Sequence, residues 1–156
     1  MIELAHLYDT NYTEWAKRNA ELLKVGSFAQ IDIPHLIDEL SDMGKAEFNE
    51  LESRLIILLA HLLKWQFQYQ QLSDKWKEFD GRSWRYTIIE QRLRLNRRLR
   101  KSPGLKSQLP QVIEAAYDDA VYLAAKETQL SKDTFPRSCS YLISEILDED
   151  FYPISA

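Results

Sequence analysis

Three ionisable residues, Glu47, Arg54 and His61, recur at intervals of seven residues within the longest helix that the sequence predicts. With Leu51 and Leu58 between them, they occupy positions that step by four and three residues, which is the spacing of a helix–helix seam. A structural helix normally places Leu or Ala there, so these groups could serve chemistry, with burial and neighbouring charges tuning their pKa values for acid–base catalysis. The alternative, which we favour, is a buried polar network that fixes the register of the helices.

A cationic helix, predicted from Ser83 to about Lys101, supplies two further members of this network. On a helical wheel Arg85 and Arg92 project between two apolar stripes, so we expect both to be partly buried and paired with a carboxylate. One stripe consists of Trp84, Ile88, Leu95 and Leu99, and the other consists of Tyr86, Ile89 and Leu93. The expected carboxylates are Glu47 and one of Glu39, Asp42 and Glu50. The candidate polar network therefore consists of Glu47, Arg54, His61, Arg85 and Arg92.

A second group of cations lies on the outer, solvated face of the same helix: Arg94, Arg97, Arg98 and Lys101. Residues 82–101 hold eight cations and one anion, a net charge of +7, whereas residues 32–54 hold two cations and seven anions, a net charge of −5. The chain, with a net charge of −4, thus carries its own counter-charge and a cationic patch that suits a protein partner. Four cations are few for phosphate binding and the acidic remainder would repel a nucleic acid, so this function ranks third.

Sequence motifs that would specify a reaction are missing. The chain has no Gly-x-Ser-x-Gly elbow and no Gly-rich phosphate loop, and its single cysteine, Cys139, has no histidine close in sequence. His35 precedes Asp38 by three residues and Glu39 by four, so two metal ligands could share one helix face, but a surface or hydrogen-bonded histidine is the commoner case. We therefore predict no metal and no cofactor, and we lean against an enzyme.

The composition, with 45% hydrophobic and 28% charged residues, is that of a soluble globular protein. The longest apolar stretch, LIILLA followed by HLL, is far shorter than the ~20 residues that a membrane span needs. One cysteine excludes an intrachain disulfide, which fits a reducing compartment, and the first residues do not have the pattern of a signal peptide. These features predict a cytoplasmic protein that does not associate with membranes.

Apolar periodicity and helix-ending signals predict an all-α protein. We expect a single domain over residues 1–156, built as a bundle of four or five main helices with a long central helix. Asn11 and Gly26 should bound the first helix, Asp32 should begin the second, and Gly44 should break or kink the chain. The remaining predicted segments are a central helix at 45–69, a polar loop at 70–81, and helices at 83–101, 111–127 and 138–147.

Three stretches are similar to one protein family: HLIDELSDMGKAEFNELESRLIILLAHLLKWQFQ, SWRYTIIEQRLRL and the closing DTFP…LDEDFYP. They resemble the domain-of-unknown-function family numbered 29 over nearly the whole chain, from about Tyr8 to Pro153. The resemblance implies a compact, all-helical bacterial protein, and it supplies no catalytic residue. The family pattern includes positions that correspond to His61, Trp65, Trp84 and Arg85.

Three functions stay open at this point. We favour a small protein-binding or assembly module, and self-association is one form of it. The alternative is an enzyme or small-ligand-binding bundle that uses the polar network. The third is a nucleic-acid-associated regulator that uses the outer cations. A closed network around His61 would favour the first function, and an open pocket lined by it would favour the second.

Overall fold

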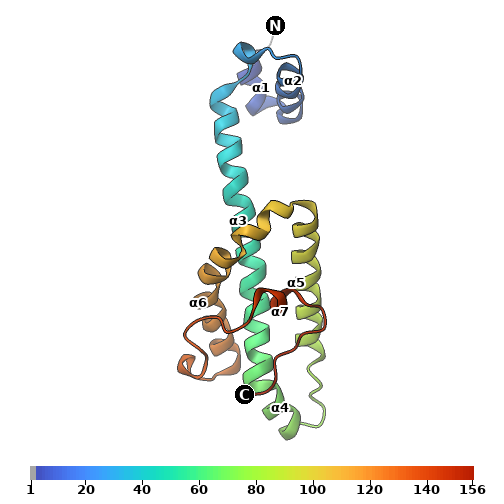
Figure 1. The fold of residues 1–156 in the computed structure, drawn as a ribbon, viewed down its shortest axis with the longest axis vertical. Coiled ribbons are helices and arrows are strands. Elements are labelled where there is room, and N and C mark those ends of the chain that lie inside the picture. Colours follow the sequence, from blue (N-terminus) through green and yellow to red (C-terminus); the bar gives the residue numbers. More distant parts are fainter. Residues whose placement is uncertain (1–2) are drawn as a thin grey trace. The chain divides into compact units, whose positions relative to one another are not determined.

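The computed structural model describes residues 3–156, which form helices and connecting segments without a strand (Figure 1). The helices are α1 (Leu4–Thr10), α2 (Tyr12–Lys24), α3 (Ile33–Lys64), α4 (Gln70–Lys75), α5 (Arg82–Lys101), α6 (Leu109–Thr128) and α7 (Ile143–Leu147). Short 3₁₀ segments occupy Phe28–Gln30, Pro103–Gln108 and Lys132–Thr134, and a π-helical turn, Trp65–Tyr69, joins α3 to α4. The predicted all-α fold with one long helix is confirmed.

The chain divides into two compact units, Met1–Glu47 and Phe48–Ala156, and α3 contributes residues to both. In the first unit α1 packs against α2. The side chain of Asn11 accepts a hydrogen bond from the backbone N–H of Glu14 at 3.2 Å, so the predicted N-cap of α2 is confirmed. Gly26, with φ of +76°, ends the turn after α2 as predicted. The single-domain organisation of residues 1–156 stays a prediction.

The long helix α3 continues through Gly44, so the predicted break or kink at this glycine is wrong. A glycine in a helix interior costs only about 0.5–1 kcal/mol relative to alanine, and good helix formers on either side of Gly44 offset that cost. The expected polar loop at 70–81 is also wrong in its first half, because the chain continues as α4 to Lys75.

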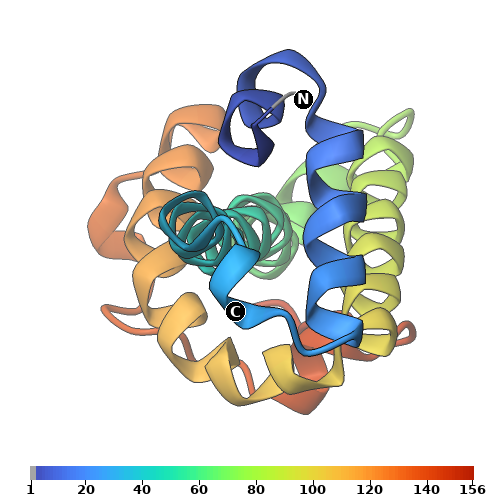
Figure 2. The ribbon, with the colours of Figure 1, turned by 90° about the horizontal axis from the view of Figure 1, so that it is seen from above.

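The core of the second unit consists of the C-terminal half of α3 together with α5 and α6, which lie on opposite sides of α3 (Figure 1 and Figure 2). Leucines on all sides of this half of α3 have no exposed surface: Leu51, Leu55, Leu58, Leu59, Leu62 and Leu63. On α6, the buried small residues Ala116, Ala120 and Ala124 lie one turn apart and allow close helix packing. The prediction of an apolar, central helix is therefore confirmed for this half of α3.

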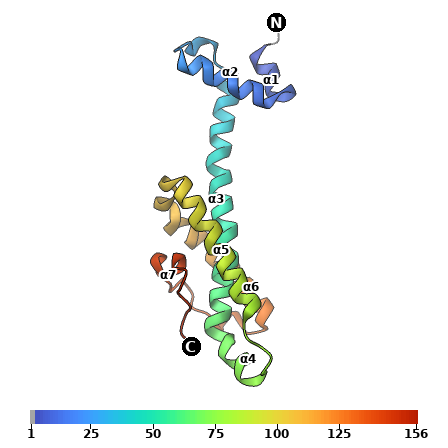
Figure 3. The same ribbon diagram turned by 90° about the vertical axis from the view of Figure 1, so that its right-hand side faces the viewer.

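The C-terminal segment folds back onto this core. Helix α7 packs against α5 (Figure 3), and its Ile146 is fully buried. The backbone N–H of Ala156 donates to the carbonyl of Gln66 at 2.9 Å, so the end of the chain returns to the π-helical turn. The predicted helix at 138–147 is shorter than expected, because only Ile143–Leu147 is helical. None of the helices within residues 3–156 combines the length and the apolar character needed to cross a membrane.

Candidate functional site

Two short motifs, HLLKWQ and SWR, meet in the second unit where α3 ends and α5 begins. The Lys64 Nζ atom lies 4.6 Å from the centroid of the Trp84 ring, and the Arg85 guanidinium carbon lies 5.6 Å from the centroid of the Trp65 ring. Each motif thus places a cation on an indole of the other, and a cation–π contact of this kind contributes about 0.5–2 kcal/mol. This crossed pair of contacts joins α3 to α5.

Lys64 is the buried cation of the crossed pair. Its ammonium also binds Glu127 of α6, with 2.5 Å between Nζ and Oε2, so one lysine connects three helices. His61 lies one turn earlier and donates from Nδ1 to the carbonyl oxygen of Ile57 at 2.8 Å. Burial lowers the pKa of His61; its hydrogen bond to Ile57 opposes the shift, and the charge of Lys64 adds to it. His61 therefore favours the neutral form.

The π-helical turn stacks two aromatic rings beside the crossed pair of cation–π contacts. The ring of Tyr69 stacks on that of Trp65, with centroids 4.1 Å apart and planes 8° apart. Gly81, which precedes α5, has φ of +69°, and a Cβ atom placed there would lie 2.5 Å from Cε2 of Tyr69. Both the backbone conformation and the lack of space therefore require glycine at this position.

Arg92 is the buried arginine of α5, with only 1% of its surface exposed. Its Nε donates to the carbonyl of Ile146 at 2.9 Å and its Nη2 to the carbonyl of Glu145 at 3.3 Å. The amide of Asn96 donates to the carbonyl of Leu147 at 3.1 Å. These carbonyls form the C-terminal, partially negative end of α7. Two side chains of α5 therefore cap α7 and hold the C-terminal segment in place.

The carboxylate partner that the sequence predicts for Arg92 is wrong, because main-chain carbonyls take its place. The rings of Phe151 and Tyr152 also flank the guanidinium carbon, with centroids at 6.0 Å and 5.6 Å. Burial lowers the pKa of Arg92, and the nearby Tyr152 and Asp148 oppose that shift. Helix-end carbonyls and aromatic faces stabilise the planar guanidinium here because both present partial negative charge to it.

Two other members of the predicted network, Arg85 and Arg54, have separate partners. Arg85 is exposed on the ring of Trp65 and takes part in none of the ion pairs found in residues 3–156, so its predicted burial and carboxylate partner are wrong. Arg54 pairs with Glu50, one turn away on its own helix, at 3.0 Å. Arg54, His61, Arg85 and Arg92 thus contact four different sets of residues and do not form one network.

The outer face of α5 is apolar in its middle. Tyr86, Ile89 and Leu93, here called the α5 trio, are between 52% and 66% exposed. Of the two predicted stripes, only the one that contains Ile88 and Leu95 is buried. The reason is geometric, since a helix that packs on one side of a core can bury only one of two stripes.

The predicted outer cations follow this trio along α5. Arg94, Arg97 and Lys101 are exposed as expected, whereas Arg98 is partly buried, so the prediction of a solvated face is wrong for Arg98. Arg94 pairs with Glu90 of the same helix at 3.0 Å. This surface is therefore cationic on the C-terminal side of the apolar trio.

A second exposed apolar face lies on the first half of α3, and the sequence patterns above do not predict it. Ile33, Ile37 and Leu40 are between 53% and 65% exposed, and Met43 is exposed as well. The signal was present in the sequence, because steps of three and four residues lead back from Glu47 through this face. The seam therefore begins at the start of α3.

A polar cluster in the first unit was also not predicted. The buried carboxylate of Asp32 accepts hydrogen bonds from the Trp15 indole at 2.8 Å and from His35 Nδ1 at 2.7 Å. Burial alone would raise the pKa of Asp32, but these two hydrogen bonds outweigh it, and the pKa lies below its usual value. The cluster ties α2 to the start of α3. Within residues 3–156 no group of three or more His, Cys, Asp or Glu side chains could hold a metal ion.

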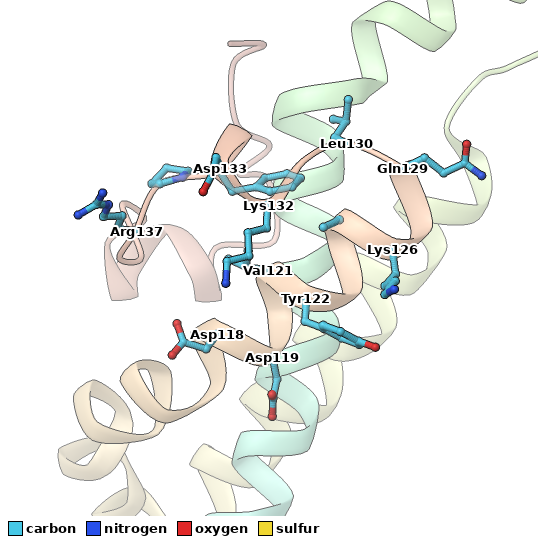
Figure 4. Close-up of a pocket in the computed structure, with 13 residues that line it drawn as sticks. Asp118, Asp119, Val121, Tyr122, Lys126, Gln129, Leu130, Lys132, Asp133 and Arg137 are labelled. Atoms are coloured by element: carbon cyan, nitrogen blue, oxygen red, sulfur yellow. The ribbon is translucent and has the colours of Figure 1, made fainter.

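A groove of about 1150 Å³ runs beside α6 in the second unit (Figure 4). Asp118, Asp119 and Tyr122 line it from the helix, and Lys132 and Arg137 line it from the segment that follows. His61 does not line this groove. The groove carries both acidic and basic side chains, so its charges favour no single class of ligand. The groove therefore does not support an enzyme built on the predicted polar network.

The fold and these contacts define a small all-helical protein in which crossed Lys–Trp and Arg–Trp contacts join the HLLKWQ and SWR motifs. The chain belongs to the family described as Domain of unknown function DUF29, whose sequence model matches residues 7–152. The match confirms the resemblance seen in the sequence and covers nearly the whole chain. Comparison with curated proteins and with solved structures finds no significant match.

Proposed function

We propose that this protein is a protein-binding module and that its docking surface is the outer face of α5. The observation that carries the proposal is the α5 trio, three large apolar side chains exposed on one face of a helix. In Figure 3 this helix is the one nearest the viewer in the second unit. Burial of such side chains against a partner would supply much of the free energy of binding.

Cations extend this face at both ends. Arg82 lies four residues before Tyr86, and Arg97 lies four residues after Leu93, so both fall in line with the trio on the helix surface. Both arginines are exposed. A partner that complements this surface is an amphipathic helix with an apolar stripe and acidic residues around it.

The positions of the polar residues support a binding module more than an enzyme. Arg54, His61 and Arg92 are each engaged in a structural contact. The apolar trio also favours a protein over a nucleic acid, because it fills the middle of the face, where a phosphate backbone would require cations. A reducing compartment such as the cytoplasm suits the chain, since its single cysteine, Cys139, forms no disulfide within the chain.

Site-specific crosslinking tests this proposal. Benzoylphenylalanine, a photoreactive amino acid, replaces Tyr86 in the full chain, and a matched variant carries it at Tyr122, which is similarly exposed on α6. After irradiation in the cells that make the protein, we expect discrete protein adducts from position 86, with crosslinked peptides that are acidic and amphipathic. No adduct at position 86, the same adducts at both positions, or adducts to nucleic acid would contradict the proposal.

A further inference from the structure

We infer that the polypeptide that docks on the α5 trio is a second copy of this chain, which binds through the first half of its α3. The inference rests on the proposed function and names its partner. The contributing surface, here called the α3 face, consists of Ile33, Ile37, Leu40 and Met43. Each of these side chains is more than half exposed.

The two faces have matching spacing. Ile37, Leu40 and Gly44 step by three and four residues along α3, and the α5 trio steps in the same way. Helices with this spacing interdigitate their side chains as knobs into holes. A Cβ atom added to Gly44 would meet no other atom within 4 Å, so this position offers room for a large side chain from a facing helix. That side chain is Leu93 if the two helices run parallel and Tyr86 if they run antiparallel.

Charge determines which faces can meet. Residues 1–47 hold nine acidic and four basic residues, a net charge of −5, whereas residues 82–101 carry +7. Two α3 faces would bring two acidic segments together, and two α5 trios would bring two cationic helices together, and both arrangements are disfavoured by repulsion. A contact between the α3 face of one copy and the α5 trio of another brings opposite charges together.

The acidic residues act on this contact from a distance. By helical periodicity Asp38 and Asp42 lie on the side of α3 away from the α3 face. Their attraction for α5 therefore works through the field of the whole segment, which speeds association and makes it sensitive to salt. The apolar side chains supply the seam itself.

Complementary charge variants of the full chain test this inference. Ile37→Arg places a cation on the α3 face, and Ile89→Glu places an anion on the α5 trio; both positions are exposed, and circular dichroism checks that each variant folds. In sedimentation equilibrium the wild type should associate, and each variant alone should associate at least about tenfold more weakly. The reason is that each introduced charge meets apolar side chains in a segment whose net charge has the same sign. An equimolar mixture should regain association, since the introduced arginine and glutamate then lie within about one turn of each other across the contact, within reach of their long side chains.

Two further sets of variants complete the test. Leu40→Arg with Leu93→Glu repeats the exchange at neighbouring exposed positions, so one misfolded variant does not decide the outcome. Tyr122→Glu is the matched control on α6, and it should associate like the wild type. A monomeric wild type, an Ile89→Glu variant that associates like the wild type, or a folded mixture that stays dissociated would overturn the inference.

Failure of this inference can be told from failure of the proposed function. Crosslinks from position 86 to a different protein, together with a monomeric wild type, would remove the second copy and leave the binding module. The absence of any crosslink from position 86 would remove both.

Discussion

The two halves of α3 share one seam and differ in what covers it. In the C-terminal half Leu51 and Leu58 have no exposed surface, whereas Ile37 and Leu40 in the N-terminal half are 58% and 65% exposed. Both pairs follow the same steps of three and four residues. The C-terminal half packs in a core with α5 and α6. A seam pattern therefore predicts which side of a helix can pack, but not whether the same chain supplies the helix that covers it.

Ionisable residues in the covered half extend this lesson. Arg54 pairs with Glu50, and His61 donates to the carbonyl of Ile57, so both use partners one turn away on their own helix. A partner at this distance satisfies a polar group without any contribution from a neighbouring helix. Ionisable residues at regular seam positions are therefore weak evidence for a network that connects helices.

Shortening one leucine in each half of α3 should give the largest difference in the free energy of unfolding. Leu58→Ala removes a fully buried side chain and leaves a cavity, so the free energy of unfolding should fall by about 2–5 kcal/mol. Leu40→Ala, the matched change in the exposed half, should alter it by less than about 0.5 kcal/mol. Urea denaturation at low protein concentration, followed by circular dichroism, measures both. Equal losses would show that the two halves do not differ in packing.

Removing the buried arginine of α5 should have the next largest effect. Arg92→Ala leaves the last carbonyls of α7 without their donors, and we expect a loss of about 2–4 kcal/mol in unfolding free energy. Arg85→Ala, on the same helix but exposed, should lose only about 0.5–1 kcal/mol, from its contact with Trp65. The same urea titration ranks the two variants. A larger loss for Arg85→Ala would restore the original prediction of a buried Arg85.

Two glycines allow the covered and exposed regions to be compared at the backbone. Gly81→Ala should destabilise the protein by about 1–3 kcal/mol, because φ is +69° and the new methyl group would overlap the ring of Tyr69. Gly44→Ala should instead stabilise α3 by about 0.5–1 kcal/mol, because the position is helical and open. Opposite shifts of the thermal midpoint are expected. A destabilising Gly44→Ala would indicate that this part of α3 is already packed.

The smallest expected effect concerns pH. Because burial lowers the pKa of His61, the unfolded chain binds a proton at this residue more readily than the folded protein does. The stability that the neutral ring contributes is complete above the unfolded pKa of about 6.5 and is lost as the pH falls through the lower, folded value. His61→Gln, which keeps a donor for the Ile57 carbonyl, should reduce the fall in thermal midpoint between about pH 7.5 and about pH 5.5. An unchanged pH dependence would place the titrating group elsewhere.

Local signals in the sequence predict the helical class and the boundaries of α2, α5 and α6, because these depend on interactions within one or two turns. Asn11 caps α2 through the backbone N–H three residues later, and the apolar periodicity of residues 83–101 and 111–127 anticipated α5 and α6 within a few residues. The continuous apolar run around Leu58 likewise identified the most buried part of α3. Gly44 was misjudged because the helix formers around it outweigh the cost of one glycine.

The partners that these helices use depend on how distant segments pack together. The carbonyls that bind Arg92 belong to residues more than 50 positions later in the chain, and no spacing in the sequence relates them to α5. Which of the two stripes of α5 is buried, and which indole receives Lys64 or Arg85, likewise depends on the side from which α3 approaches. Local sequence sets helices and their faces because its interactions span one or two turns. The pairing of those faces depends on contacts between distant segments, which form only when the chain has folded.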